Sequence, residues 1–193
     1  RIEPLKGLDT LIRALAIMRA EGVYVCLMVI GGDPDQASLD GQTEMSRLKS
    51  LCAAAGLEDL VTFIGKRSQD TLPYYYSAAE AVVMPSFYES FGMVALEAMA
   101  CGAPVVASQV GGLAYLVQDG VTGFSVPVDD PQVLADRLTM ILRDPLLRQR
   151  LSLQAVAVAR EYAWEKITDR ILCLYSELLE NWAFPVGAEG RLE

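Results

Sequence analysis

The sequence predicts an α/β protein with a Rossmann-like parallel sheet and helices on both faces of that sheet. Short apolar runs alternate along the chain with longer helical patterns, which is the order of elements in a parallel sheet. The run at 23–30 is apolar throughout, as expected for a strand that is buried on both faces. With 193 residues, 52% of them hydrophobic, the chain can bury the core of one domain.

Local signals place the individual elements. Asp9 can cap a first helix whose apolar residues recur at helical spacing as far as Met18, and Gly22 can stop it. Pro73 is tolerable only in the first turn of a helix at 69–79. The predicted strands cover 23–30, 61–64, 81–84, 105–107 and 123–126. The other predicted helices cover 42–55, 90–101, 113–117, 131–142, 145–162 and 165–182.

The chain begins with the loop 1–7, whereas doubly wound domains begin with a strand. We therefore expect that a first strand is missing before Arg1 and that its absence leaves a gap in the sheet. The first residue is not methionine, and the last two, Leu192 and Glu193, resemble an expression scar. We expect one domain at 1–182 and a loose tail at 183–193, together a piece of a larger protein.

Charge and composition restrict the function. A net charge of −9 makes nucleic-acid binding a poor hypothesis. No apolar run approaches the roughly 20 residues of a membrane span, so we expect a cytoplasmic protein whose membrane contact, if any, is made by another domain. Cys26, Cys52, Cys101 and Cys173 lack metal-ligand spacing and predict buried free thiols. Histidine, the commonest general base and metal ligand, is absent, and we expect no metal site and no cofactor.

The stretch PSFYESFGMVALEAMACG at 85–102 contains two glutamates, one of them inside an apolar helix. Glu97 needs hydrogen-bond donors there, and the neighbouring hydroxyls of a ribose are suitable. A lysine or arginine elsewhere in the fold could equally pair with it. Glu89 precedes the helix and could lie near the end of a bound diphosphate, or it could simply complement the helix dipole.

Ligands of open parallel sheets bind beyond the carboxyl ends of the strands. The helix predicted to start at Ser90 or Phe91 would present free N–H groups to an anion there, with Gly92 in its first turn leaving room for a phosphate. Arg1 and Lys6 could add positive charge on this face, although a terminal arginine and a loop lysine are ordinarily solvated charges.

Two other features have simpler interpretations. The run Tyr74, Tyr75 and Tyr76 sits on a helix, so the three side chains point in different directions, and packing explains them better than base stacking. Asp129 and Asp130 stand before Pro131 and indicate a helix start, in preference to a metal pair.

Taken together, the motifs resemble the carboxyl-terminal, nucleotide-sugar-binding domain of GT-B retaining glycosyltransferases of the large family 4 (glycosyl transferases group 1). The likeness covers about 1–182 and is nearest to the sucrose-phosphate synthase branch. The motifs are R-x4-K-G at 1–7, G-G-D-P at 31–34, V-T-F-I-G at 61–65, P-S-x2-E-S-F-G-x4-E-A at 85–98, G-x-P-V-V-A-S-x-V-G-G at 102–112 and D-G-x-T-G at 119–123.

The resemblance implies roles for individual residues. Arg1 and Lys6 would hold the donor diphosphate, Glu89 would orient the transferred sugar, and Glu97 would hold the ribose. The expected donor contacts are completed by Gly32, Gly65, Lys66, Arg67, Ser90, Phe91, Gly92, Met93 and Val94. The partners implied are a nucleotide-sugar donor, with UDP-glucose preferred, and an amino-terminal acceptor domain of the same protein.

The implied reaction is transfer of a hexosyl group with retention of configuration, as in carbohydrate biosynthesis. Without the acceptor domain we expect the chain to bind donor weakly and to transfer nothing. A nucleotide-sugar-binding module without activity is a second hypothesis, and the intact residue set argues against it. A GT-B-type nucleotide-sugar epimerase is a third, and the absence of histidine argues against it. No G-x-G-x-x-G follows a strand, so a dinucleotide oxidoreductase is disfavoured.

Overall fold

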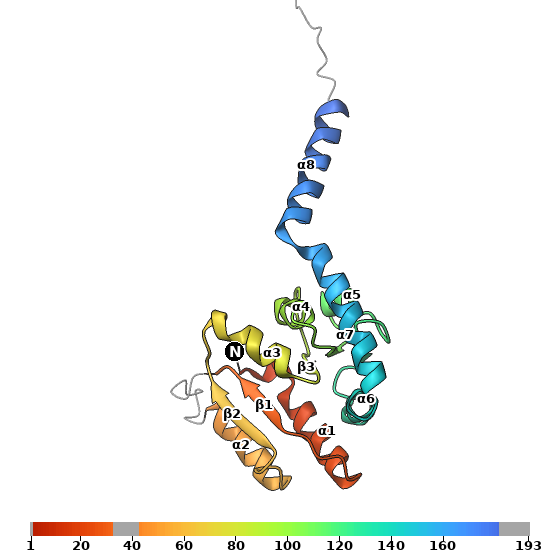
Figure 1. The fold of residues 1–193 in the computed structure, drawn as a ribbon. Helices are drawn as coiled ribbons and strands as arrows, with labels where there is room; N and C mark the ends of the chain where they lie inside the picture. The colour runs from red at the N-terminus through yellow and green to blue at the C-terminus, as the bar shows by residue number, and fades with distance from the viewer. Residues whose placement is uncertain (1, 33–42, 182–193) are drawn as a thin grey trace, which may run out of the picture.

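The computed structural model describes residues 2–32 and 43–181 of the chain. Strands and helices alternate along it as far as α6 Pro131–Arg143, as expected, and two more α-helices then follow (Figure 1). The strands are β1 Leu27–Ile30, β2 Val61–Gly65, β3 Val82–Met84, β4 Val105–Ser108 and β5 Gly123–Val126. The α-helices are α1 Leu8–Ala20, α2 Glu44–Ala54, α3 Leu72–Ala78, α4 Met93–Ala100, α5 Leu113–Leu116, α6 Pro131–Arg143, α7 Pro145–Ala159 and α8 Trp164–Asn181. Short 3-10 turns are η1 Pro4–Lys6, η2 Gln69–Thr71 and η3 Arg160–Tyr162.

All the strand pairs of the described residues are parallel, and they form two separate sheets. One sheet contains β1 and β2, with Val29 opposite Phe63. The other has the order β3-β4-β5, with Val106 opposite Phe124. The expected interruption of the sheet is therefore present, between the β1-β2 pair and the three-stranded part.

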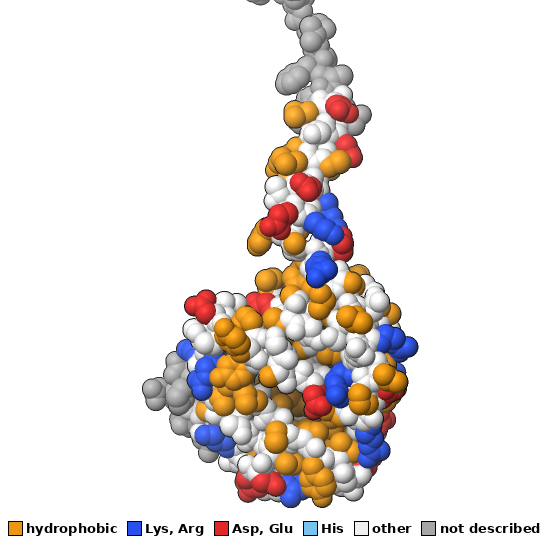
Figure 2. All heavy atoms as spheres, in the orientation of Figure 1, with side chains coloured by type: hydrophobic (Ala, Val, Ile, Leu, Met, Phe, Trp, Pro, Cys, Tyr) orange, Lys and Arg blue, Asp and Glu red, His pale blue; other side chains and the backbone are white. Residues whose placement is uncertain are grey.

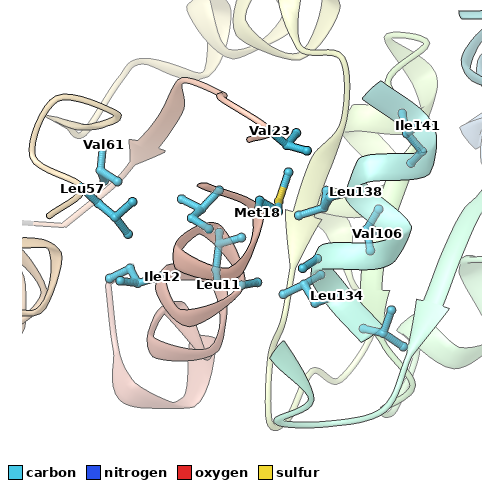
Figure 3. Packing of buried hydrophobic residues seen from close by; sticks show 14 of the residues in the cluster. Leu11, Ile12, Met18, Val23, Leu57, Val61, Val106, Leu134, Leu138 and Ile141 are labelled. Atoms are coloured by element: carbon cyan, nitrogen blue, oxygen red, sulfur yellow. The ribbon is translucent and has the colours of Figure 1, made fainter. Parts of the chain in front are cut away.

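Helix α1 joins the two sheets into one structure. Its buried side chains, including Leu11 and Met18, belong to a core cluster that also contains Val29 and Val61 from the first sheet. The same cluster continues through Leu134 and its neighbours on α6 to strands β4 and β5. Figure 3 shows α1 lying between these two sets of side chains. Burial of this apolar surface from both sides stabilises the arrangement despite the interruption.

Alternate residues of β4 point to opposite faces of the three-stranded sheet and meet different helices. Val106 faces the cluster of α1 and α6, whereas Val105 and Ala107 face a second cluster. That second cluster contains Met99 from α4 and Ala155 from α7. Every residue of β4 is buried, so the prediction of a parallel sheet with helices on both faces is confirmed.

Several predicted boundaries need correction. Asp9 does not cap the first helix, because Gly7, with φ +66°, precedes the helix that begins at Leu8. Only 27–30 of the apolar run 23–30 form a strand. The helix expected from Ser90 or Phe91 begins at Met93. Pro73 lies in the first turn of α3, as predicted.

The cysteines also differ from expectation. All four are free, as predicted, but Cys26 and Cys173 are exposed, Cys101 is partly buried, and only Cys52 is buried. Cys173 is exposed because it lies on α8, which projects from the rest of the chain (Figure 1). The expected tail at 183–193 lies outside the described residues.

Candidate functional site

The loop that follows β3 contacts the amino-terminal loop. The amide of Phe87, in the loop after β3, donates to the carbonyl of Leu5 over 2.9 Å. Gly7 lies so close to this loop that a Cβ there would be 1.9 Å from the carbonyl oxygen of Pro85. The sequence thus uses a glycine at the point where the two segments touch.

The loop after β4 also contacts the segment that follows β3. The amide of Gly112 contacts the carbonyl oxygens of Glu89 and Ser90 at 3.2 and 3.1 Å. A Cβ on Gly111 would be 1.8 Å from the carbonyl oxygen of Glu89, so the glycine pair permits this approach. The loop that contains Glu89 is therefore held by the amino-terminal loop at Pro85 and Phe87 and by the loop after β4 at Glu89 and Ser90.

Lys6 and Glu89 form an ion pair at this junction. The distance from Lys6 Nζ to Glu89 Oε2 is 2.7 Å, and the two side chains are 35% and 16% exposed. The structure therefore brings together two of the three residues expected to act on the diphosphate and the transferred sugar. The third, Arg1, lies outside the described residues.

Helix α4 begins immediately after this junction. Gly92 is its N-cap, with φ +97°, and a Cβ there would lie 2.7 Å from Leu113 Cδ2. The N–H groups of Met93, Val94 and Ala95 follow and have no partner within the helix, as in any first turn. The helix dipole adds positive potential at the same place. The helix start where an anion site was predicted therefore lies at Gly92–Ala95, and Met93 and Val94 are exposed there. Anion binding at this position stays a prediction.

Ser90 and Phe91 precede the helix and do not supply its first free N–H groups. Ser90 is exposed. The Phe91 ring makes an edge-to-face contact with Tyr162, at 6.0 Å between ring centroids, and stays 43% exposed. This contact anchors the loop to the segment that follows α7.

Glu97 lies in the second turn of α4 and accepts two hydrogen bonds from the neighbouring segment. Tyr76 on α3 donates its hydroxyl to Oε2 over 3.0 Å, and Gln69 on η2 donates its amide to Oε1 over 3.1 Å. Burial, together with this bond, raises the pKa of Tyr76. The interpretation of the tyrosine run as packing was incomplete, because the buried ring of Tyr76 does pack but its hydroxyl contacts a site carboxylate.

The sequence contained a signal for this contact, although it was not sufficient. A carboxylate in an apolar helix needs donors, and a buried tyrosine hydroxyl needs a partner. Three consecutive tyrosines leave open which one turns inward, and the answer depends on how α3 packs against α4. Gln69, at an exposed turn, carried no comparable signal.

Two further predicted loops lie side by side at the ends of β1 and β2. The amide of Gly31 donates to the carbonyl of Gly65 over 2.9 Å. Gly32, with φ +79°, packs against Ile2, and a Cβ there would lie 2.7 Å from Ile2 Cδ1. Gly32 thus lies beside the amino-terminal loop, and Gly65 lies beside Gly31, the residue before Gly32. The motif residues 33–34 lie outside the described residues.

Lys66 and Arg67 follow β2 and are exposed. Arg67 donates from Nε to the hydroxyl of Tyr75 and from Nη1 to the carbonyl of Lys66, at 3.2 and 2.9 Å. This loop therefore contacts α3 through Arg67 and Tyr75. Gln69, two residues after Arg67, donates a hydrogen bond to Glu97. The structure places the loop on the Glu97 side of the site and shows no bond from Arg67 to Lys6 or Glu89.

Within 2–32 and 43–181, no group of three or more acidic, cysteine or histidine side chains could hold a metal ion. In the same part of the chain, none of the helices combines the length and apolar character needed to span a bilayer.

The chain is similar to curated proteins over most of its length. The chain is 41% identical over 180 residues to a D-inositol 3-phosphate glycosyltransferase of Salinispora arenicola, an alignment that covers 92% of this chain and 40% of that protein. The chain thus spans about two fifths of the length of this curated relative.

Solved structures show the same fold. The sucrose-phosphate synthase of Thermosynechococcus elongatus superposes with a TM-score of 0.81 at 38% identity, over 93% of this chain and 44% of the other. The Anabaena protein Alr3699/HepE, solved in complex with UDP, gives 0.78 at 31% identity, over 92% and 47%. The fold is therefore that of GT-B glycosyltransferases, as the motifs predicted.

A sequence model of the family described as "Glycosyl transferases group 1" matches residues 1–157, which contain both glutamates and all of the loops described above. On this match and these relatives, the chain belongs to the glycosyl transferases group 1 family.

Proposed function

We propose that this chain is the donor-binding half of a retaining glycosyltransferase, which moves a hexosyl group from a nucleotide-diphosphate sugar to an acceptor held by an amino-terminal domain. One observation carries the proposal. Glu89 with its partner Lys6, the free end of α4 and the partly exposed Glu97 follow one another from the loop after β3 into the helix. A nucleotide sugar has the matching series of sugar, diphosphate and ribose.

The diphosphate would lie at the start of α4. Free N–H groups and the positive end of the dipole favour an anion there. The Lys6 ammonium has three donors, so it can contact a phosphate oxygen while it keeps its bond to Glu89. Arg1 is part of the proposal as a second cation. Charge that builds on the departing diphosphate would then meet a preorganised positive environment.

The ribose would bind at Glu97, whose carboxylate is partly open to solvent. Backbone groups of 65–67 would meet the base, while Glu89 would orient the transferred sugar. Uridine and glucose are preferred, because the Anabaena protein, 31% identical to this chain, was solved with UDP and with UDP-glucose. The donor is a substrate here, and neither a metal nor a cofactor is part of the proposal.

The acceptor would be bound elsewhere in the whole protein, and its identity does not follow from this chain. The described site offers no nucleophile paired with a base, which suits front-face departure and attack with retained configuration. By itself the chain would bind donor nucleotide and transfer no sugar.

Titration calorimetry with UDP, GDP and ADP tests the donor site. We expect one of these nucleotides to bind, and Glu97→Ala to weaken it by about tenfold or more, as expected when bonds to a charged group are lost. Glu21→Ala is the matched control, because Glu21 is an exposed glutamate at the far end of α1 from Gly7. Failure of all three nucleotides to bind the folded chain would contradict the proposal, and so would equal binding by both variants.

A further inference from the structure

Tyr76 makes the more deeply buried of the two contacts to Glu97. Its side chain is 8% exposed and belongs to the core cluster that contains Met84 and Ala98. The ring is therefore fixed by packing, and its hydroxyl points at one oxygen of Glu97 over 3.0 Å. Gln69, in contrast, reaches the other oxygen from an exposed turn.

The number of acceptor positions on the carboxylate is informative. An ionised carboxylate has two oxygens with about four lone-pair sites. Tyr76 occupies one site on Oε2 and Gln69 occupies one on Oε1, so each oxygen keeps one. Two adjacent hydroxyls, as in the cis-diol of a ribose, could use one remaining site on each oxygen.

We propose that Tyr76 is a positioning residue of the donor site, which holds the Glu97 carboxylate so that its two free lone pairs face the two ribose hydroxyls. This inference rests on the proposed function, since it assigns Glu97 to a ribose. The rigid ring supplies the orientation, because a glutamate side chain on a helix surface otherwise samples several rotamers whose loss opposes binding.

The chemistry of the phenol suits this role. Its pKa is raised by burial and by the bond to Glu97, so the hydroxyl remains a donor throughout the neutral range. Tyr76 does not touch the reacting atoms, so its effect should appear in nucleoside binding and depend on the ribose hydroxyls.

The test compares Tyr76→Phe with wild type in titrations with UDP and with 2′,3′-dideoxy-UDP. Phenylalanine keeps the buried ring and removes only the hydroxyl. We expect Tyr76→Phe to bind UDP about fivefold to tenfold more weakly than wild type. We expect both proteins to bind the dideoxy nucleotide equally, because it lacks the hydroxyls that Glu97 would hold. Tyr74→Phe is the matched control, since Tyr74 lies on the same helix and is 75% exposed.

A double-mutant cycle completes the test. If Tyr76 acts through Glu97, Tyr76→Phe will change UDP affinity less than twofold in the Glu97→Ala background. Equal weakening of UDP and dideoxy-UDP would show a merely structural role and overturn the inference. Unchanged UDP binding by Tyr76→Phe, with binding lost in Glu97→Ala, would overturn the inference alone. Absence of nucleotide binding by wild type would instead overturn the proposed function and this inference with it.

Discussion

At the scale of single residues, the site depends on glycines at positions where the backbones of two loops come so close that no side chain would fit between them. Gly7 and Gly111 both have positive φ, and at each a Cβ would fall within 2 Å of a carbonyl oxygen from the loop after β3. Their roles differ from that of Gly22, which has a similar φ of +75° but open space around it. A left-handed conformation alone explains Gly22, whereas Gly7 also permits contact between loops.

This difference can be measured by Gly7→Ala and its control Gly22→Ala. Both place a Cβ at positive φ, which costs about 1–2 kcal/mol. Only Gly7→Ala also drives a methyl group to 1.9 Å from the Pro85 oxygen, so it should lower the free energy of unfolding by about 1–3 kcal/mol more. Denaturant unfolding compares the two. Equal losses in both variants would mean that the loops at Gly7 do not touch in solution.

The residues of the site were predictable to different degrees. Glu97 could be singled out because a carboxylate in an apolar helix needs a partner. Lys6 and Glu89 each have an ordinary explanation when taken alone, and the resemblance to the family is what assigned them roles. The direct bond between Lys6 and Glu89 could not be predicted, because the two residues are 83 positions apart and meet only when the loop after β3 packs beside the amino-terminal loop. The partner of Glu97 depended in the same way on the packing of α3 against α4.

At the scale of elements, an ion pair links α1 to α2. Arg47 donates to both carboxylate oxygens of Asp9, at 2.7 and 2.5 Å, and also to Glu44 one turn earlier on its own helix. Asp9 was predicted to cap α1, but Gly7 already occupies that position. The carboxylate instead lies in the first turn, where it complements the dipole of α1 and binds a cation from α2.

This pair makes the stability of the chain depend on pH in a defined range. The hydrogen bond and charge of Arg47 lower the pKa of Asp9 below its ordinary 3.8. A lowered pKa means that the contribution is complete above pH 3.8 and is lost as the pH falls through the folded-state value. Asp9→Asn should therefore reduce the free energy of unfolding at pH 7 by about 0.5–1 kcal/mol, because the pair is partly exposed and screened by solvent.

The difference between Asp9→Asn and wild type should shrink below pH 3.8, when unfolding is followed by denaturant titration across pH. Asp169→Asn, at an exposed position on α8, removes the same charge and should have little effect. A constant difference at all pH values would show that the carboxylate charge of Asp9 contributes nothing.

Strand β1 shows why boundaries are harder to predict than elements. The apolar run 23–30 predicted a strand of that length, but its first part completes α1. The amide of Val23 bonds to the carbonyl of Met18 over 2.8 Å, and its side chain joins the core beside that helix. Apolar character reports burial, and a residue can be buried at a helix end as well as in a strand.

At the scale of the whole molecule, the fold class followed from the alternation of elements, which many residues encode at once. An interruption of the sheet was also predicted, and the structure has one between the β1-β2 pair and the β3-β4-β5 sheet. Which helix would bridge it was not predicted. The structure assigns this role to α1, whose buried side chains contact both parts of the core (Figure 3).

Helix α8 is the helix that packing against the core of the described chain does not stabilise. Apart from Ile167, its described side chains are exposed, including Ile171, Leu174 and Leu178. Figure 2 shows apolar side chains along its projecting length. Helical stability in proteins comes mostly from packing of an apolar face, and here that face meets solvent. In the isolated chain α8 should therefore contribute little to the free energy of unfolding.

A pair of leucine substitutions tests this arrangement. Leu151 on α7 is 0% exposed, so Leu151→Ala should lower the free energy of unfolding by about 2–5 kcal/mol through the cavity that it leaves. Leu178 on α8 is 52% exposed, so Leu178→Ala should change the free energy of unfolding by less than about 0.5 kcal/mol. Denaturant unfolding at several protein concentrations measures both effects. A loss above about 1 kcal/mol for Leu178→Ala would mean that α8 packs against protein in solution. If that loss also depended on protein concentration, the partner of α8 would be a second copy of the chain.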